Sequence, residues 1–143
     1  DRPHGYFAGI PTFVKDNVDV EGMPTMQGTD AWEPRPKPAH GEFARLFLAS
    51  GLVPVGKTQL SEFGFSASAE HPRLGAVRNP WDTEYTAGAS SSGSGAFVAA
   101  GVVPIAHAND GSARLFVVEQ GGKIIIVKNG AKLYSTRFSY DLW

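Results

Sequence analysis

Residues 88–108, GASSSGSGAFVAAGVVPIAHA, form the stretch that decides the fold. A loop rich in serine and glycine leads directly into small apolar residues, which predicts a helix over residues 92–100. Residues 102–108 return to an apolar, β-branched run and predict a strand. A loop, a helix and a strand in direct succession indicate an α/β fold.

The same alternation extends toward the N-terminus. Residues 9–15 and 53–56 are strand-like, and residues 41–50 carry apolar side chains at helical spacing, ended by Gly51. We therefore expect residues 1–111 to form one α/β unit.

Residues 112–143 differ in composition from the rest. Residues 1–111 hold 8 basic and 12 acidic side chains, whereas the last part holds 5 basic and 2 acidic ones. Its apolar runs flank a Gln-Gly-Gly turn, and the Asn129–Gly130 pair that follows is a strong hairpin signal. We expect a short antiparallel β-meander that is separate from the first unit.

Composition excludes several function classes. The 143 residues are 42% apolar and carry a net charge of -1, which argues against nucleic-acid and membrane partners. The absence of cysteine rules out disulfides and thiolate metal sites, and the four histidines lack metal-ligand spacing, so we expect no metal. The compartment is not fixed, with the cytoplasm favoured. The chain does not begin with Met, so we expect residues before Asp1.

The segment GLVPVGKT at residues 51–58 has the spacing of a phosphate-binding loop. Such a loop needs flexible residues whose backbone N–H groups wrap the phosphate. Here apolar residues fill the interval, and one of them is a proline without an N–H. We expect a buried strand that ends at Gly56 and no nucleotide site.

Two other features have both a structural and a chemical interpretation. A loop of serine and glycine is often a flexible linker, but at a helix start it offers hydroxyls and free N–H donors. Lys15 follows an apolar strand, where a lysine is usually exposed. The alternative is a desolvated amine that acts as a base.

Four motifs in order resemble the amidase signature family. They are GIPTFVKDNVDV at residues 9–20, VGKT at 55–58, NPW at 79–81 and GASSSGSG at 88–95. The resemblance covers about residues 5–111 and implies a partial mixed sheet with flanking helices. It also implies hydrolysis of a small amide by a Ser–cis-Ser–Lys triad, with no cofactor.

The resemblance assigns roles to single residues. Lys15 matches the family's catalytic lysine, and Ser90 matches the bridging serine, which follows a cis peptide bond in the family. A neutral lysine can take a proton through the bridging hydroxyl from the nucleophilic serine. Backbone N–H groups of the following glycine-rich loop, with Gly111 in it, would hold the oxyanion.

The nucleophile position departs from the family pattern. In the family the nucleophile lies 24 residues after the bridging serine, in a segment Asp-x-Gly-Gly-Ser-Ile/Val-Arg, and this count leads to Arg114. Ser112 is the substitute in this loop, two residues early, which is roughly 6–7 Å along an extended chain. We therefore expect the chain to be inactive as a hydrolase.

The tail has a resemblance of its own. DGSARLFVVEQGGKI at residues 110–124 is similar to the first blade strands of the glucose/sorbosone dehydrogenase family, which are quinoprotein β-propellers. This implies a chimera joined near residues 110–114, and no functional residue of that family is carried over. Two alternatives to a hydrolase follow: a non-catalytic binding module that uses the tail's β edge, and a chimeric fragment with no selected function. An exposed core or β edge would also favour self-association.

Overall fold

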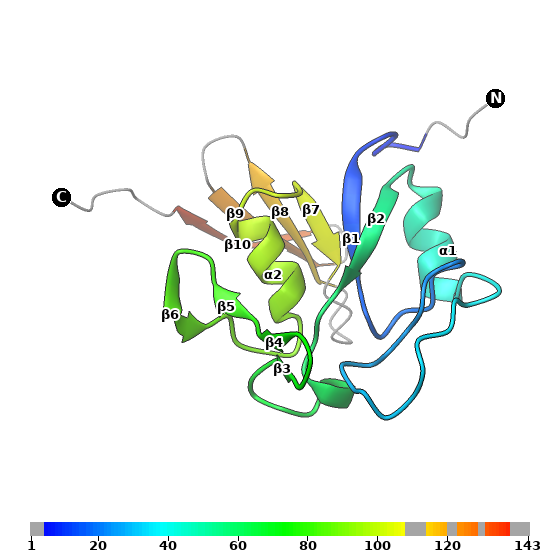
Figure 1. Cartoon of the computed structure of the whole chain (residues 1–143). Coiled ribbons are helices and arrows are strands. Elements are labelled where there is room, and N and C mark those ends of the chain that lie inside the picture. Colours follow the sequence, from blue (N-terminus) through cyan, green and yellow to red (C-terminus); the bar gives the residue numbers. More distant parts are fainter. Residues whose placement is uncertain (1–4, 108–113, 120–122, 129–130, 138–143) are drawn as a thin grey trace.

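The computed structural model describes residues 5–107, 114–119, 123–128 and 131–137. These ranges hold a mixed sheet, two α-helices, one 3₁₀ turn and two small two-stranded sheets (Figure 1). In chain order the elements are β1 (Pro11–Lys15), α1 (Glu42–Ala49), β2 (Val53–Thr58), η1 (Glu62–Gly64), β3 (Glu70–His71), β4 (Gly75–Ala76), β5 (Arg78–Asn79), β6 (Asp82–Thr86), α2 (Ser92–Ala99), β7 (Ile105–His107), β8 (Arg114–Glu119), β9 (Lys123–Lys128) and β10 (Ala131–Arg137).

The main sheet has the strand order β10-β9-β8-β7-β1-β2. Strand β1 pairs in parallel with both β2 and β7, so these three strands end on the same side of the sheet. Strands β8, β9 and β10 are antiparallel to their neighbours. The expected α/β class with a mixed sheet is confirmed.

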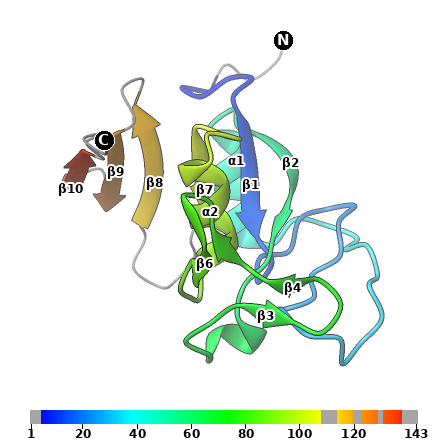
Figure 2. The same ribbon diagram turned by 60° about the vertical axis from the view of Figure 1, so that its left-hand side comes forward.

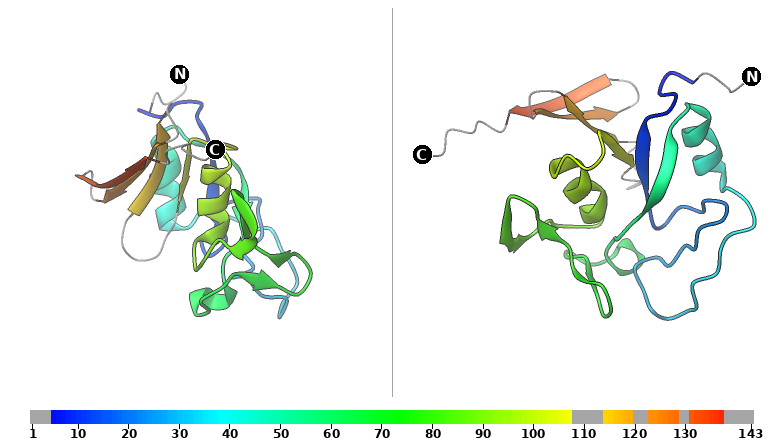
Figure 3. Two further views of the ribbon diagram at one scale, coloured as in Figure 1. Left: turned by 90° about the vertical axis from the view of Figure 1, so that its left-hand side faces the viewer. Right: turned by 45° about the horizontal axis from the view of Figure 1, so that its top comes forward.

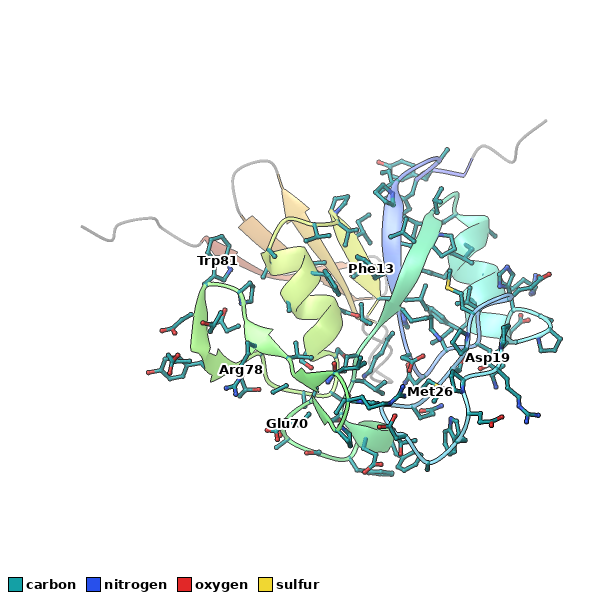
Figure 4. The ribbon with its side chains drawn as sticks, viewed as in Figure 1. Phe13, Asp19, Met26, Glu70, Arg78 and Trp81 are labelled. Carbon is teal, nitrogen blue, oxygen red and sulfur yellow. The ribbon has the colours of Figure 1, made fainter. Side chains whose placement is uncertain are left out.

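The two helices cover opposite faces of the parallel strands (Figure 3). On one face Val14 packs in a buried cluster with Ala44 of α1. On the other face the ring of Phe13, labelled in Figure 4, stacks on Phe97 of α2 with ring centroids 4.4 Å apart. Because side chains alternate along a strand, Lys15 belongs to the α2 face together with Phe13.

Strand β2 corrects one expectation from the sequence. It runs to Thr58 rather than ending at Gly56, and it is an edge strand rather than a buried one. Val53 and Val55 are 46% and 52% exposed. Within the described ranges β1 is the one strand that pairs with β2.

The tail continues the main sheet in the structure. Strand β8 pairs with β7, placing Leu115 opposite His107, and β9 and β10 extend the sheet outward. The residues that join β7 to β8, with the proposed seam at 110–113, lie outside the described ranges. The division into units 1–111 and 112–143 therefore stays a prediction.

Loops and small hairpins gather beyond the carboxyl ends of the parallel strands. Figure 2 shows β1 and β2 pointing toward the part of the chain that holds η1, β3 and β4. The β5–β6 hairpin lies beside them, and its Trp81 is 54% exposed. Neither described helix is long or apolar enough to cross a bilayer.

Candidate active site

Lys15 ends β1 and is buried under the α2 face of the sheet. The residue is 1% exposed, so the usual exposed position of a strand-end lysine does not apply here. A buried amine needs hydrogen-bond partners, and two of them come from a segment far along the chain.

Those partners are the first two hydroxyls of the serine loop. The Nζ atom of Lys15 donates to Ser90 Oγ at 2.7 Å and to Ser91 Oγ at 2.9 Å. The peptide bond between Ala89 and Ser90 is cis, as the resemblance implies. Both serines are half-buried, so hydroxyls in reach of solvent lie in front of a buried amine.

Ser91 is a contact that the sequence reasoning missed. The run of three serines was the available signal, because the hydroxyl next to Ser90 lies within reach of the same amine. The structure thus brings together the predicted Lys15 and Ser90 and adds Ser91 to them.

The first turn of α2 is anchored to the end of β2. Ser94 Oγ donates to the carbonyl of His107 at 2.7 Å. The hydroxyl of Ser94 has one proton, so Thr58 Oγ1 is the donor in their 2.8 Å contact. The backbone N–H of Gly93 donates to the carbonyl of Gln59 at 3.2 Å, and the backbones approach too closely for a side chain at this position.

The lysine of the phosphate-loop-like segment makes an ion pair. Lys57 Nζ contacts Asp16 Oδ1 at 3.0 Å, and both side chains are mostly buried. Burial raises the pKa of the Asp16 carboxyl above its ordinary 3.8, and the neighbouring Lys57 opposes this rise. Residues 53–58 are a strand, so the backbone there does not form a loop that could wrap a phosphate.

Two of the predicted site residues are not placed. Gly111 and Ser112 lie outside the described residues, so their roles in the oxyanion site and as nucleophile stay predictions. Arg114 is the first residue of β8, and its backbone pairs with Lys128.

The three histidines within the described residues each contact a neighbouring group, and His4 lies outside those residues. The ring of His107 stacks on Phe43 with centroids 3.9 Å apart, and His71 lies 3.3 Å from Asp30. His40 accepts a hydrogen bond from the backbone N–H of Glu21. Within the described ranges no three histidine or carboxylate side chains gather as a metal-binding set.

Comparison with known proteins identifies similar chains. The family described as "Amidase" matches residues 1–115. A Mycobacterium leprae protein named "Putative amidase AmiC" is 77% identical over 107 residues, which are 75% of this chain and 23% of the relative. An indoleacetamide hydrolase of Bradyrhizobium diazoefficiens is 39% identical over 106 residues, which are 74% of this chain and 20% of that protein.

A solved structure shares the fold. The 6-aminohexanoate cyclic dimer hydrolase complexed with substrate superposes with a TM-score of 0.70 at 36% identity. The match covers 76% of this chain and 23% of that one. The chain therefore spans less than a quarter of the length of each of these three proteins. The resemblance of its tail to a β-propeller family stays a prediction.

Proposed function

The chain belongs to the amidase family, and from this premise we propose that it carries the proton-relay half of an amide hydrolase. The observation that carries the proposal is the contact between the buried Lys15 Nζ and Ser90 Oγ at 2.7 Å. Lys15 is the base of this relay and Ser90 is its bridge.

The relay follows from the donors and acceptors at the site. The working form of Lys15 is the uncharged amine, which has one lone pair and two N–H groups. In the structure Nζ donates to both hydroxyls. Once the amine has lost a proton, its lone pair can take the place of the N–H that points at Ser90 Oγ, while another N–H keeps the bond to Ser91. Ser90 in turn takes a proton from the attacking hydroxyl.

The full reaction needs an attacking hydroxyl beside Ser90. That hydroxyl would form a bond to the amide carbon, and its proton would pass through Ser90 to Lys15. The same proton then returns to the departing amine as the carbon–nitrogen bond breaks, and water releases the acyl group by the reverse route. No cofactor is required at any step.

The position that holds the nucleophile in the family holds no nucleophile in this chain. Arg114 stands at the family position, and a guanidinium cannot attack a carbonyl. Ser112 is the substitute, two residues earlier, and a displacement of that size is not tolerated in nucleophilic catalysis. We propose that the chain does not turn over amides at a measurable rate.

The substrate class is that of small amides. The indoleacetamide hydrolase among the relatives is named for such a compound, and the similar cyclic dimer hydrolase is also named as a hydrolase. A small activated acyl donor is therefore a suitable probe of the relay, because it needs little substrate-binding surface.

The test is acylation by p-nitrophenyl acetate, with the modified residue located by peptide mass spectrometry. We expect one acetyl group on Ser90 or Ser91, and its loss in Lys15→Ala. Acetylation of Ser112 that depends on Lys15 would also support the relay and would identify Ser112 as the nucleophile. No acetylation, or acetylation that persists in Lys15→Ala, would contradict the proposal.

One observation favours a second, non-catalytic function. Strand β10 lies at the edge of the main sheet, and no strand in the described part of the chain pairs with its outer side. Unpaired backbone groups of an edge strand can bind an extended peptide or a second copy of the chain. Light scattering over a range of concentrations tests the self-association, which a constant monomer mass would exclude.

A further inference from the structure

Three consecutive residues, the last two of β2 and the one after it, contact the segments that directly follow Lys15 and Ser91. We propose that Lys57–Thr58–Gln59, the positioning tripeptide, holds Lys15 against Ser90 and Ser91. This inference rests on the proposed function, because it assigns a role relative to the base Lys15. It also gives the lysine of the phosphate-loop-like segment a role that involves no nucleotide.

The first contact, made by Lys57, holds the residue that directly follows Lys15. Lys57 Nζ donates to Asp16 Oδ1 at 3.0 Å, to the carbonyl of Pro24 at 3.1 Å and to Thr25 Oγ1 at 3.1 Å. These three bonds use all three N–H groups of the ammonium. Asp16 directly follows Lys15, so the ion pair acts on the residue next to the base.

Backbone bonds strengthen this contact. The N–H of Asp16 donates to the carbonyl of Thr58 at 3.1 Å, which continues the β1–β2 ladder past Lys15. The second carboxylate oxygen of Asp16 accepts from the N–H of Met26 at 3.1 Å. Figure 4 shows Met26 below the ends of β1 and β2, so the loop that leaves Lys15 closes on the ion pair.

The second contact fixes the serine side. Thr58 Oγ1 donates to Ser94 Oγ at 2.8 Å, and the carbonyl of Gln59 accepts from the N–H of Gly93 at 3.2 Å. Ser94 and Gly93 lie in the first turn of α2, which begins directly after Ser91. The strand end that holds the lysine side therefore also holds the helix start that carries the serines.

The side chains point to opposite sides of the strand. Adjacent residues of a strand alternate between its faces, so Lys57 lies on the Val14 face and Thr58 on the Lys15 face. The ammonium of Lys57 donates its three hydrogen bonds to Asp16, Pro24 and Thr25, and none of them goes to a serine hydroxyl. Lys57 is therefore a positioning residue that acts through Asp16 and not a catalytic one.

Burial explains why Lys57 would matter more than a surface lysine. The side chains of Lys57 and Asp16 are 11% and 14% exposed, whereas those of the Arg45–Glu42 pair are 60% and 71% exposed. Removing one partner of a buried pair leaves the other charge uncompensated, whereas removing an exposed partner has little effect. Arg45→Met is thus a matched control for the loss of an ion pair.

The experiment measures the Lys15-dependent acetylation rate by p-nitrophenyl acetate in Lys57→Ala, Lys57→Arg and Arg45→Met. We expect Lys57→Ala to lower the rate about 100-fold, the scale of a misplaced catalytic group. Lys57→Arg should recover much of the loss, since it restores the charge, and Arg45→Met should leave the rate unchanged. Equal rates in Lys57→Ala and Arg45→Met would overturn the inference.

Chemical rescue separates the role of the charge from a loss of folding. A cavity of about 200 Å³ is lined by Lys57, Asp16 and Thr58, so it can admit a small amine when Lys57 is shortened. Propylammonium should raise the rate of Lys57→Ala, whereas propanol of similar size should not. If Lys57→Ala does not fold by circular dichroism, Thr58→Val takes its place, and an unchanged rate there would count against the inference.

Failure of the proposed function would give a different result. If the unaltered chain is not acetylated, the relay itself is refuted. The positioning role is then decided by the ¹³Cε signal of Lys15, titrated with pH in the unaltered chain, in Lys57→Ala and in Arg45→Met. A midpoint that moves only in Lys57→Ala supports the positioning tripeptide, and superimposable titrations overturn it.

Discussion

The Nζ atom of Lys15 lies 2.7 Å from the Oγ atom of Ser90, although the two residues are 75 positions apart in the chain. Parallel pairing places Thr12 and Phe13 of β1 beside β7, and α2 packs over the face to which Lys15 belongs. The start of α2 therefore faces the end of β1. A contact between a buried amine and a hydroxyl thus follows from the order of the elements.

The chain should not hydrolyse simple amides. Arg114 occupies the family position of the nucleophile, and Ser112 lies two residues before it. Release of aniline from benzamide-type anilides should stay at the background rate. Steady turnover that is lost in both Ser112→Ala and Lys15→Ala would show this expectation to be wrong and would make Ser112 the relocated nucleophile.

The chain should not bind ATP. The three donors of Lys57 are taken by protein oxygens, and the residues before it form a strand. Isothermal calorimetry should give no heat of binding, and Lys57→Ala should behave in the same way. Binding that disappears in Lys57→Ala would restore the phosphate-loop interpretation.

Two glycines in α2 should respond oppositely to alanine. A Cβ atom at Gly93 would lie 2.5 Å from the carbonyl oxygen of Gln59, whereas one at Gly95 would meet nothing within 4 Å. Gly93→Ala should therefore destabilise the fold by about 1–3 kcal/mol. Gly95→Ala should stabilise the fold by about 0.5–1 kcal/mol through helix propensity. Urea unfolding measures both, and equal effects would contradict the close packing of α2 on Gln59.

Asp16 should give the stability a characteristic pH dependence. Burial raises its pKa above 3.8 in the folded chain, so the folded state holds this proton more tightly than the unfolded state. The contribution of Asp16 to the free energy of unfolding is fully present below pH 3.8. It is lost as the pH rises through the raised pKa of Asp16. The difference in unfolding free energy between the unaltered chain and Asp16→Asn should follow this trend.

The exposed carboxylate of Glu42 supplies a control, because its effect on stability changes with pH in the opposite direction. The hydrogen bond from Arg45 lowers the pKa of Glu42 below its ordinary 4.5, so its contribution is present above pH 4.5 and is lost as the pH falls. Glu42→Gln should remove the pH dependence that Glu42 causes and leave the one that Asp16 causes. A stability difference for Asp16→Asn that is flat, or that increases with pH, would contradict the burial of Asp16.

The sequence predicts much of the fold because its signals are local. The helical spacing before Gly51 predicted α1 within a residue at each end, and the small-residue run after the serine loop predicted α2. The exposure of β2 could not be predicted in this way. Whether a strand lies at an edge depends on which segments pair with it, and nothing within residues 53–58 encodes that.

The candidate site was predictable only in part for a similar reason. The family resemblance marked Lys15 and Ser90, and the structure places them in contact. The Asp16–Lys57 pair joins residues 41 positions apart, and no periodic pattern links such residues. The sequence marks Lys57 by its spacing from Gly51, whereas the contacts of Lys57 depend on tertiary structure.

In the proposed relay Lys15 acts as the base for the serine loop. The most direct test is the acetylation rate constant with p-nitrophenyl acetate for the unaltered chain, Lys15→Met and Lys37→Met. Lys37 is a lysine whose side chain is 36% exposed, so it serves as the control. We predict a loss of about 100-fold in Lys15→Met, the scale of general-base catalysis, and no change in Lys37→Met. Equal rate constants for all three chains would contradict the account.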